Sequence, residues 1–513
     1  MPRDRRYPRL LAAGLALALL TGCGGPDPVL PVPSTPPPTA SPVQQEAQVF
    51  QLPCYPEAGF HPFTGVNRTN QALNGLLYEG LYELDTDFNP QGVLAVSHSM
   101  SEDARSWTFT LRQGVTFSDG SPLTPADVAT ALNQARQEGQ YATRLAGVTG
   151  VTAGEGTVTI TLSAPNGALP ALLDVPIVKG TAERPAGTGP YQITGEGDDL
   201  SLTARQNWWR GEALPLDTIS LWAIQEPDDL IYAFDTRDLS LVSADLTGAD
   251  TLGYSGSYET VDFSTSVLLY LGFNTTSGPC REAGVRQALA RGLDRQTIAA
   301  ALLSSHAQAA ALPFHPQTAL YDATQAAGLD YTPQAMLDQL QGMGWSLSGE
   351  TLVRGGQPLA LTLVVNQDNI HRQGVADFLA ESLTQAGVSV TVQKLPWDAY
   401  LSALEGGQFD LYLGEARLTG DFDIAPLLTP SGALNYGHFS DPALTALLEA
   451  YQSAAGDARV QAAKALSAAL VQQVPIAPLC FKNWSVLSQW GQISALTATQ
   501  QNLFYHFWTW KLG

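Results

Sequence analysis

Four charged side chains lie close together in the segment GEARLTGDFDIAPLL. Glu415 and Arg417 stand two residues apart at the end of a strand-like run, so their side chains leave the strand on the same face. They could form a structural ion pair there, or they could act as a charge clamp for the two ends of a zwitterion. Asp421 and Asp423 follow, where a carboxylate can cap the start of a helix. The chemistry that this segment offers is the recognition of charge.

The sequence lacks the local signatures of common catalytic and metal sites. The cysteines have no CxxC spacing, and the seven histidines form neither HxxxH nor HExxH. Neither a GxSxG elbow nor a GxxxxGKS/T loop occurs. We therefore expect no catalytic residues, no metal site and no cofactor. An extracellular hydrolase, the alternative class, would need a nucleophile and a base that the fold brings together.

The elements that position the charged segment alternate between residues 359 and 415. In turn they read LALTLVVN, IHRQGVADFLAESLTQAG, VSVTVQKL, WDAYLSALEGG and FDLYLGEA. This strand and helix alternation is typical of a mostly parallel α/β sheet. In the first helix Val375, Leu379 and Leu383 share one face, and Gly387 ends it. Ligands of such sheets bind beyond the carboxyl ends of the strands, which is where the charged segment lies.

Other stretches predict further local structure. Apolar residues alternate in WTFTL and again in VTF, so two short strands are expected over residues 107–117. Thr124 then stands as an N-cap, with Pro125 in the first helical turn and Asp127 completing a capping box. NQALNGLLYEGL at residues 70–81 predicts a helix. The C-terminal FYHFWTW is most simply a buried strand.

The N-terminus predicts the signal peptide of a lipoprotein over residues 1–22. A basic start is followed by LLAAGLALALL, which is about half of the ~20 residues that a helix needs to cross a bilayer. The run ends at LTGC, which resembles the lipobox of bacterial lipoproteins, where cleavage precedes a cysteine that receives lipid. We therefore predict lipid on Cys23, with a chance cysteine in an ordinary signal peptide as the alternative. The proline-rich residues 23–48 predict a stalk, because they cannot bury a core.

The rest of the chain predicts a large globular body with an acidic surface. The 513 residues are 44% hydrophobic and carry a formal net charge of −22 at pH 7. Such a charge disfavours nucleic acid and anionic lipid as partners. Besides Cys23, only Cys54, Cys280 and Cys480 are present, which allows at most one disulfide. We expect a monomer whose stability does not depend on a disulfide scaffold.

Seven segments resemble the family 5 extracellular solute-binding proteins, which are the oligopeptide, dipeptide and nickel receptors of ABC importers. They occur in the order of the family and cover essentially the whole body from about residue 49 to the end. The segments are YEGLYELD (78–85), SWTFTLRQGVTFSDGSPLTPADV (106–128), GTGPY (187–191), NWWRGEALPLDTI (207–219), FNTTSGPCREAGVRQALARGLDRQTI (273–298), LPWDAYLSALEGGQFDLYLGE (395–415) and VPIAPLCFKNWSVL (474–487).

The resemblance implies an α/β fold of the periplasmic-binding-protein-like type II, cluster C. Such a fold has two α/β lobes joined by a hinge, and an extra lobe inserted in the first. We expect lobe I at residues 49–80, 183–275 and 479–513. The inserted lobe is expected at residues 81–182, and lobe II, the distal α/β lobe, at residues 276–478.

The resemblance also implies which charged residue faces the ligand. Peptide receptors of the family carry an acidic residue after the strand FDLYL that pairs with the ligand's α-ammonium, and Asp421 best matches it. The proline expected after the second aspartate is replaced by Ile424, so Asp423 competes for this role. Either carboxylate could instead be a helix cap.

Aromatic residues are the second group of candidates. Trp397 matches the cleft tryptophan of the family, and a flat ring suits a receptor that accepts varied side chains. Tyr82, Phe481 and Trp484 are further candidates of the same kind. For each of these aromatic residues, ordinary burial in the core is the alternative.

The function implied by the resemblance is a lipid-anchored receptor on the extracellular or periplasmic side of the cell membrane. It would bind a short peptide between two closing lobes and deliver it to the permease and ATPase subunits of an ABC transporter. A nickel complex or a small glycan is the alternative cargo within the family. A lipid anchor and a stalk suit a cell without a periplasm to confine its binding protein.

Overall fold

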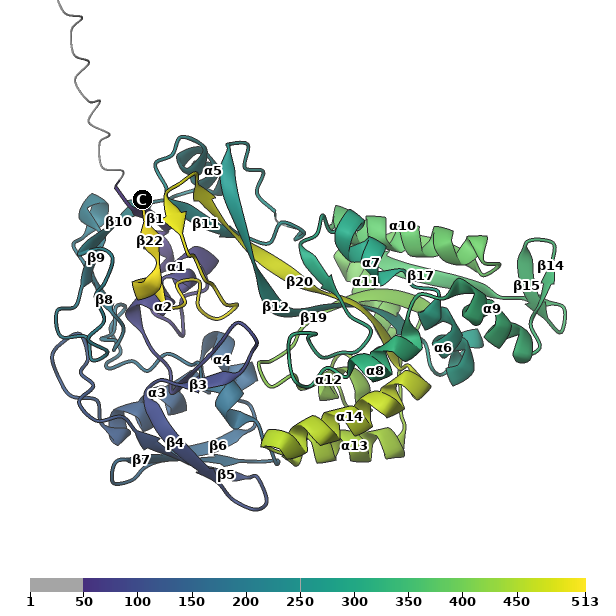
Figure 1. Ribbon diagram of the computed structural model, residues 1–513, viewed down its shortest axis with the longest axis horizontal. Coiled ribbons are helices and arrows are strands. Elements are labelled where there is room, and N and C mark those ends of the chain that lie inside the picture. Colours follow the sequence, from purple (N-terminus) through teal and green to yellow (C-terminus); the bar gives the residue numbers. More distant parts are fainter. Residues whose placement is uncertain (1–48, 250) are drawn as a thin grey trace, which may run out of the picture. The chain divides into compact units, whose positions relative to one another are not determined.

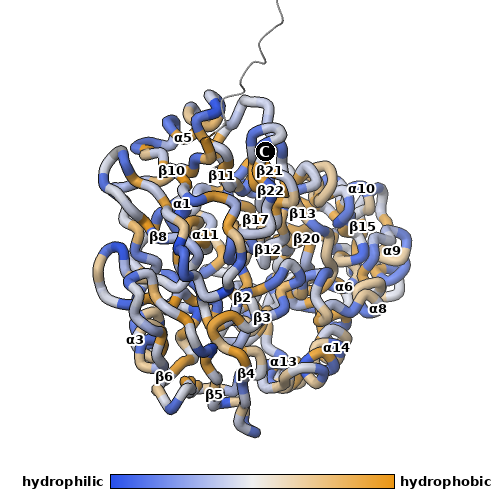
Figure 2. Tube along the Cα trace, turned by 60° about the vertical axis from the view of Figure 1, so that its left-hand side comes forward, coloured by the Kyte–Doolittle hydropathy of each residue, from blue (hydrophilic) through white to orange (hydrophobic). Residues whose placement is uncertain are grey.

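The computed structural model describes residues 49–249 and 251–513. Residues 49–513 form one compact unit. The predicted signal peptide, the lipidation site Cys23 and the stalk lie outside the described residues. Within the described ranges, no helix is both long and apolar enough to cross a membrane. Figure 1 shows the elements in sequence colours, and Figure 2 shows hydrophilic residues mainly at peripheral turns.

A four-stranded sheet, in the order β1-β10-β9-β8, lies in the part of the chain predicted to be lobe I. Its strands are β1 (Gln51–Cys54), β8 (Tyr191–Thr194), β9 (Ser201–Ala204) and β10 (Thr218–Ala223). β1 pairs in parallel with β10, far along the chain, so the intervening residues can form a separate sheet. The helices of this part are α1 (Arg68–Ala72), α2 (Asn74–Leu77) and α5 (Pro227–Asp235). The helix predicted over residues 70–81 is therefore two short helices, and Tyr82 already begins a strand.

The inserted lobe contains a second four-stranded sheet, in the order β4-β5-β7-β6. The sheet consists of β4 (Ala95–Met100), β5 (Ser106–Leu111), β6 (Val148–Ala153) and β7 (Thr157–Leu162). The same lobe also contains β2 (Tyr82–Leu84), β3 (Pro90–Gly92), α3 (Pro125–Ala135) and α4 (Gly139–Arg144). The capping box at Thr124 and Asp127 is confirmed. The second predicted strand is not: Thr116 forms only an isolated bridge with Pro122, because the chain turns back within a few residues.

Lobe II is built on a seven-stranded sheet that reaches into lobe I, in the order β11-β20-β12-β19-β17-β18 with β13 beside β20. The strands are β11 (Leu241–Ala244), β12 (Tyr258–Phe273), β13 (Ala307–Ala309), β17 (Ala360–Asn366), β18 (Ser389–Leu395), β19 (Leu411–Arg417) and β20 (Ile476–Gln489). The predicted alternation is confirmed, since β17 runs parallel to both β18 and β19. The predicted lobe II boundary at residue 276 falls just after β12.

Helices cover both faces of this sheet. One face carries α6 (Ala283–Arg291), α9 (Pro333–Gly342) and α10 (Ile370–Gln385), and the other carries α11 (Trp397–Glu405), α13 (Pro442–Ser453) and most of α14 (Gly456–Gln473). The side chains of β12 alternate between the two cores: Leu269 and Leu271 enter the first, and Leu268 and Tyr270 the second. Tyr270 lies opposite Gly414, whose missing side chain leaves room for the ring.

The C-terminal segment is not the buried strand that its aromatic residues suggest. Phe507–Thr509 is a short 3-10 helix, and His506 has a positive φ of 52°. The segment is buried nonetheless through Phe504, Phe507 and Trp510. These residues recur every third position, which fits the 3-10 period and not the alternation of a strand. Only short strands flank the segment, β21 (Ile493–Ser494) and β22 (Lys511–Leu512).

Two long antiparallel strands, β12 and β20, connect lobe I to lobe II (Figure 1). We call them the connecting strands. Their register shifts between Ser264 and Leu268. At this irregularity the Thr265 hydroxyl donates to the Lys482 carbonyl at 2.6 Å and accepts from the Val267 N–H at 3.2 Å. Side-chain hydrogen bonds thus satisfy the backbone where regular pairing is interrupted.

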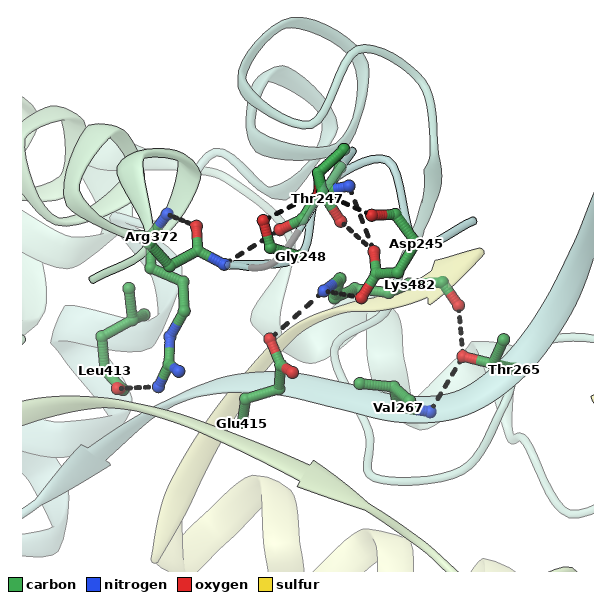
Figure 3. Close-up of polar contacts among 11 residues, drawn as sticks. Asp245, Thr247, Gly248, Thr265, Val267, Arg372, Leu413, Glu415 and Lys482 are labelled. Atoms are coloured by element: carbon green, nitrogen blue, oxygen red, sulfur yellow. Dashed lines mark hydrogen bonds and ion pairs between the residues drawn. The ribbon is translucent and has the colours of Figure 1, made fainter. Parts of the chain in front are cut away.

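Lys482 of β20 pairs with carboxylates from both lobes (Figure 3). Its Nζ lies 2.8 Å from Asp245, just after β11, and 3.5 Å from Glu415 of β19. The lysine side chain is only 3% exposed, whereas the two carboxylates keep 16% and 26% exposure. A second link lies close by, because Asn369 Nδ2 donates to the Thr247 carbonyl at 2.9 Å. The loop after β11 is therefore held to lobe II at two points.

The Lys482→Met variant should be less stable than the parent by about 2 kcal/mol, because two carboxylates lose their common cation. Urea unfolding followed by tryptophan fluorescence measures the difference. The matched control is Lys394→Met, whose pair with Asp377 is exposed on both sides (38% and 53%). That change should cost less than about 0.5 kcal/mol. Equal stability of Lys482→Met and the parent would contradict this expectation. It would mean that the attraction between Lys482 and the two carboxylates only cancels the free-energy cost of burying the lysine.

Candidate ligand-binding cavity

A cavity of about 490 Å³ is lined mainly by residues of the predicted lobe I and inserted lobe, with Arg417 as the lining residue from the predicted lobe II. This volume lies within the roughly 300–1,000 Å³ of small-molecule sites. Lobe I contributes α1 and α2, the inserted lobe contributes β2 and α4, lobe II contributes the end of β19, and the C-terminal segment closes another side. Every predicted lobe thus supplies part of the wall.

Lobe I positions its share of the wall through a capped, tightly packed turn. The Asn67 side chain accepts from the Asn70 N–H and caps α1, which begins at Arg68. The buried Asn70 amide donates to the Tyr55 and Gly59 carbonyls and so fixes this helix to the preceding loop. Further along the wall, a Cβ on Gly75 would come within 1.9 Å of the Asn502 side chain. Only glycine lets the C-terminal segment approach α2 this closely.

Three arginines, one from each lobe, gather at one end of the cavity. Arg68 and Arg417 both lie against the Trp484 ring, with guanidinium carbons 4.8 and 5.4 Å from its centroid. Arg144, the last residue of α4, pairs with Asp174. Desolvation by the surrounding wall, with repulsion from Arg144 and Arg68, lowers the pKa of Arg417 to about 10. Arg417 remains charged at neutral pH.

The opposite end of the cavity is lined by aromatic rings around a paired arginine. Arg210 Nη2 and Nε lie 3.3 Å from Glu83 and Glu79 respectively. The Arg210 guanidinium also lies over the rings of Trp208 and Trp508. Glu79 accepts a 2.6 Å hydrogen bond from Trp209, and its burial raises its pKa. This end offers flat apolar surface with its own charges already neutralised.

Three predicted site residues, Tyr82, Arg417 and Trp484, line the cavity. The Tyr82 hydroxyl is 2.7 Å from His98 Nδ1. Glu415 does not pair with Arg417: it meets Lys482, while Arg417 meets Trp484. The predicted ion pair is therefore wrong, because each member finds its own partner on β20.

Asp421 and Asp423 lie outside the cavity lining and bind groups of the protein. Asp421 is 6% exposed and accepts from Asn166 Nδ2 of the inserted lobe at 3.0 Å and from the Thr419 hydroxyl. Asp423 accepts from the Ala425 N–H at 3.0 Å and from Gln452 Nε2 at 2.9 Å. Ala425 begins the short helix α12 (Ala425–Leu428), whose N-cap residue is Ile424, so Asp423 contacts the first residue of the helix without being its N-cap. Desolvation and the charge of Asp421 raise the pKa of Asp423. A contact of either carboxylate with a ligand ammonium stays a prediction.

The remaining aromatic candidates also lie away from the cavity lining. Trp397 begins α11, is 48% exposed and lies 5.8 Å from the Tyr400 ring. Phe481 is fully buried against His315 and Phe422, as the core alternative expected. Their contact with a ligand stays a prediction as well.

Sequence reasoning missed Arg68, Arg144, Trp208 and Lys482. No local pattern marks them, since each depends on a partner from a distant segment. Trp208 lies within NWWRGEALPLDTI and Lys482 within VPIAPLCFKNWSVL, so the family resemblance was a signal that could have drawn attention to these two residues. In the part of the chain that the structure describes, no group of three or more His, Cys, Asp or Glu side chains could hold a metal ion.

Comparisons with known proteins agree with this architecture. The curated relatives include protein XP55 of Streptomyces lividans, 28% identical over 74% of this chain and 73% of its own length. They also include the glutathione-binding protein GsiB of Salmonella typhimurium, 25% identical over 71% of this chain and 74% of its own. A solved structure of a nickel ABC transporter protein from Bacillus halodurans aligns with a TM-score of 0.74 at 21% identity, covering 88% of this chain and 97% of that one.

The architecture is that of the type II periplasmic binding proteins, which the structural likeness supports. The sequence profile of the bacterial extracellular solute-binding proteins, family 5, matches residues 89–432, which is most of the described body and includes the end of β19. The chain belongs to the family 5 bacterial extracellular solute-binding proteins.

Proposed function

We propose that this protein is the substrate-binding component of an ABC importer, and that it captures a short peptide for delivery to a membrane permease and its ATPase. The observation that carries the proposal is the cavity, whose walls come from lobe I, the inserted lobe and lobe II. A ligand that touches several lobes favours their closed arrangement in proportion to its differential affinity. The connecting strands, which run from lobe I into lobe II, are the proposed hinge.

Contacts between lobes support a closing motion. Asn166 of the inserted lobe donates to Asp421 of lobe II at 3.0 Å, and the Gly167 N–H donates to the Gln452 carbonyl at 2.7 Å. An apolar contact accompanies these bonds, because Phe88 of the inserted lobe packs against His315 and Phe422 of lobe II, with ring centroids 4.9 and 5.3 Å apart. Movement of the lobes would therefore break these two hydrogen bonds and this apolar contact together.

The cargo proposal draws on the cavity and on the relatives together. A glutathione-binding relative and exposed arginines in the cavity both suit a small ligand with a carboxylate. A nickel complex is the second candidate, because a nickel ABC transporter protein shares the fold. Since no metal-binding group occurs among residues 49–249 and 251–513, the metal would have to arrive with its own ligands.

The purified full chain should bind short peptides and return them unchanged. Calorimetry against a tripeptide library measures binding, and mass spectrometry of the recovered ligand separates a receptor from a hydrolase. Intact peptides after saturation are expected. Cleaved products would contradict the receptor role, and an absence of binding across the library would contradict the peptide cargo.

We propose further that Asp421 binds the ligand's ammonium, which takes the place of the Asn166 amide as the hydrogen-bond donor to this carboxylate. Asp421→Asn should then weaken a free-amine peptide roughly thirtyfold, because an enclosed ammonium is left without its counter-ion. The same peptide with an acetylated N-terminus should bind the parent and the variant equally. Asp423→Asn is the matched control. An equal loss for both peptides would mean that Asp421 serves only the contact between lobes.

We also propose that Cys23 carries the lipid anchor that holds the receptor at the membrane. Cys23→Ala should abolish incorporation of a labelled fatty acid and release the protein from the membrane fraction. Ligand binding should be unchanged, since residues 49–513 form a compact unit of their own. Equal labelling of the variant and the parent would contradict this assignment.

A further inference from the structure

The charges in the cavity do not balance, and the imbalance is local. Eight charged side chains line the cavity: Arg68, Arg144, Arg210, Arg417, Glu79, Glu83, Asp174 and Asp245. Arg144 pairs with Asp174, Arg210 with both glutamates, and Asp245 with Lys482. Among the residues that the structure describes, Arg68 and Arg417 have no ion-pair partner within 4.0 Å. The two unneutralised cations are the ones that share the Trp484 ring.

This imbalance is notable in a chain with a net charge of −22. Acidic residues outnumber basic ones by 48 to 26, so carboxylates are plentiful. The cavity itself contains four of them, and each is engaged elsewhere. Two arginines that contact one tryptophan ring without a carboxylate therefore leave a positive site that an anion from outside the protein can neutralise.

Unpartnered polar atoms in the cavity lining point to the same kind of ligand. Trp484 Nε1 beside the two arginines, Trp208 Nε1 at the other end and Gln501 Oε1 have no hydrogen-bond partner within the described ranges. Trp208 is only 5% exposed, so its N–H is a buried donor awaiting an acceptor. An indole N–H only donates, and so does a guanidinium. The unused polar groups at this site thus mostly require an acceptor such as a carboxylate oxygen.

We propose that the cavity binds a net-anionic ligand with at least two carboxylates, one of which bridges Arg68 and Arg417 beside Trp484. This inference rests on the proposed receptor function and adds the charge class of the cargo. A carboxylate between Arg68 and Arg417 neutralises one of their two positive charges, and the α-ammonium of a zwitterionic peptide adds another positive charge, so the balance requires a second carboxylate. The carboxylates could belong to an acidic peptide or to the chelator of a metal complex.

The same arrangement gives the ligand a part in closure. Arg68 belongs to lobe I and Arg417 to lobe II, so in the empty protein their like charges oppose the approach of the lobes. A carboxylate between them turns this repulsion into two attractions. An anionic ligand therefore binds the closed arrangement with greater preference than a neutral ligand of the same size.

Calorimetry on the full chain with three tripeptides tests the inference: Glu-Ala-Glu, Ala-Ala-Ala and Lys-Ala-Lys. Citrate and Ni(II)–citrate are the other probes, because they present carboxylates without a peptide. The acidic tripeptide should bind at least about tenfold tighter than the neutral one. Arg417→Gln and Arg68→Gln should each reduce that affinity by about tenfold and reduce the affinity for Ala-Ala-Ala, which has a single carboxylate, by less. Arg417→Lys, which keeps the charge, should restore most of it.

Arg105→Gln is the matched control, because Arg105 is exposed on the inserted lobe and does not line the cavity. Equal or tighter binding of the neutral or the basic tripeptide would overturn the inference and leave the peptide receptor standing. Binding of citrate or its nickel complex alone, lost in Arg417→Gln, would support the inference and overturn the peptide cargo. Failure of every probe at millimolar concentration would overturn both.

Discussion

The antiparallel pairing of β12 with β20 is the constraint on which the rest of the structure depends. These strands belong to both lobes, and their register places Lys482 and Trp484 against residues of both lobes. Lys482 and Trp484 stand two residues apart on β20, as Glu415 and Arg417 do on β19. Each meets its counterpart: Lys482 pairs with Glu415, and Trp484 stacks with Arg417. One interruption in the ladder, between Ser264 and Leu268, adjoins both pairs.

The Lys482–Glu415 pair and the Trp484–Arg417 pair have different roles in the cleft. The Lys482 pair is internal, because a buried cation is neutralised by carboxylates from lobe I and lobe II and holds the loop after β11. The contact of Trp484 with Arg417 is incomplete in charge, because Arg417 and Arg68 line the cavity and neither is paired with a carboxylate of the described residues. A receptor needs both kinds of contact: a fixed one about which the lobes are arranged, and an unsatisfied one that the ligand completes.

Much of the fold could be predicted from the sequence, because its signals are local. The alternation over residues 359–415 and the capping box at Thr124 each depend on neighbouring residues. The prediction for the C-terminal segment was wrong because it relied on aromatic content, which suggested a strand. The buried rings recur every third residue, and this spacing indicates the 3-10 helix that the segment forms. The candidate site was harder: Arg68, Arg144 and Lys482 acquire their roles only through partners more than 29 residues away. No periodicity encodes that.

If a ligand in the cavity brings the lobes together, the distance between the inserted lobe and lobe II should shorten when the ligand binds. Ala164 of the inserted lobe and Glu449 of lobe II are exposed on either side of the contact between Gly167 and Gln452. Spin labels on cysteines at these two positions, measured by pulsed electron spin resonance, report the opening; the native Cys54, Cys280 and Cys480 are buried. We predict a broad, longer distance without ligand and a single short one with Glu-Ala-Glu at saturation. The same distance distribution in both samples would contradict the account.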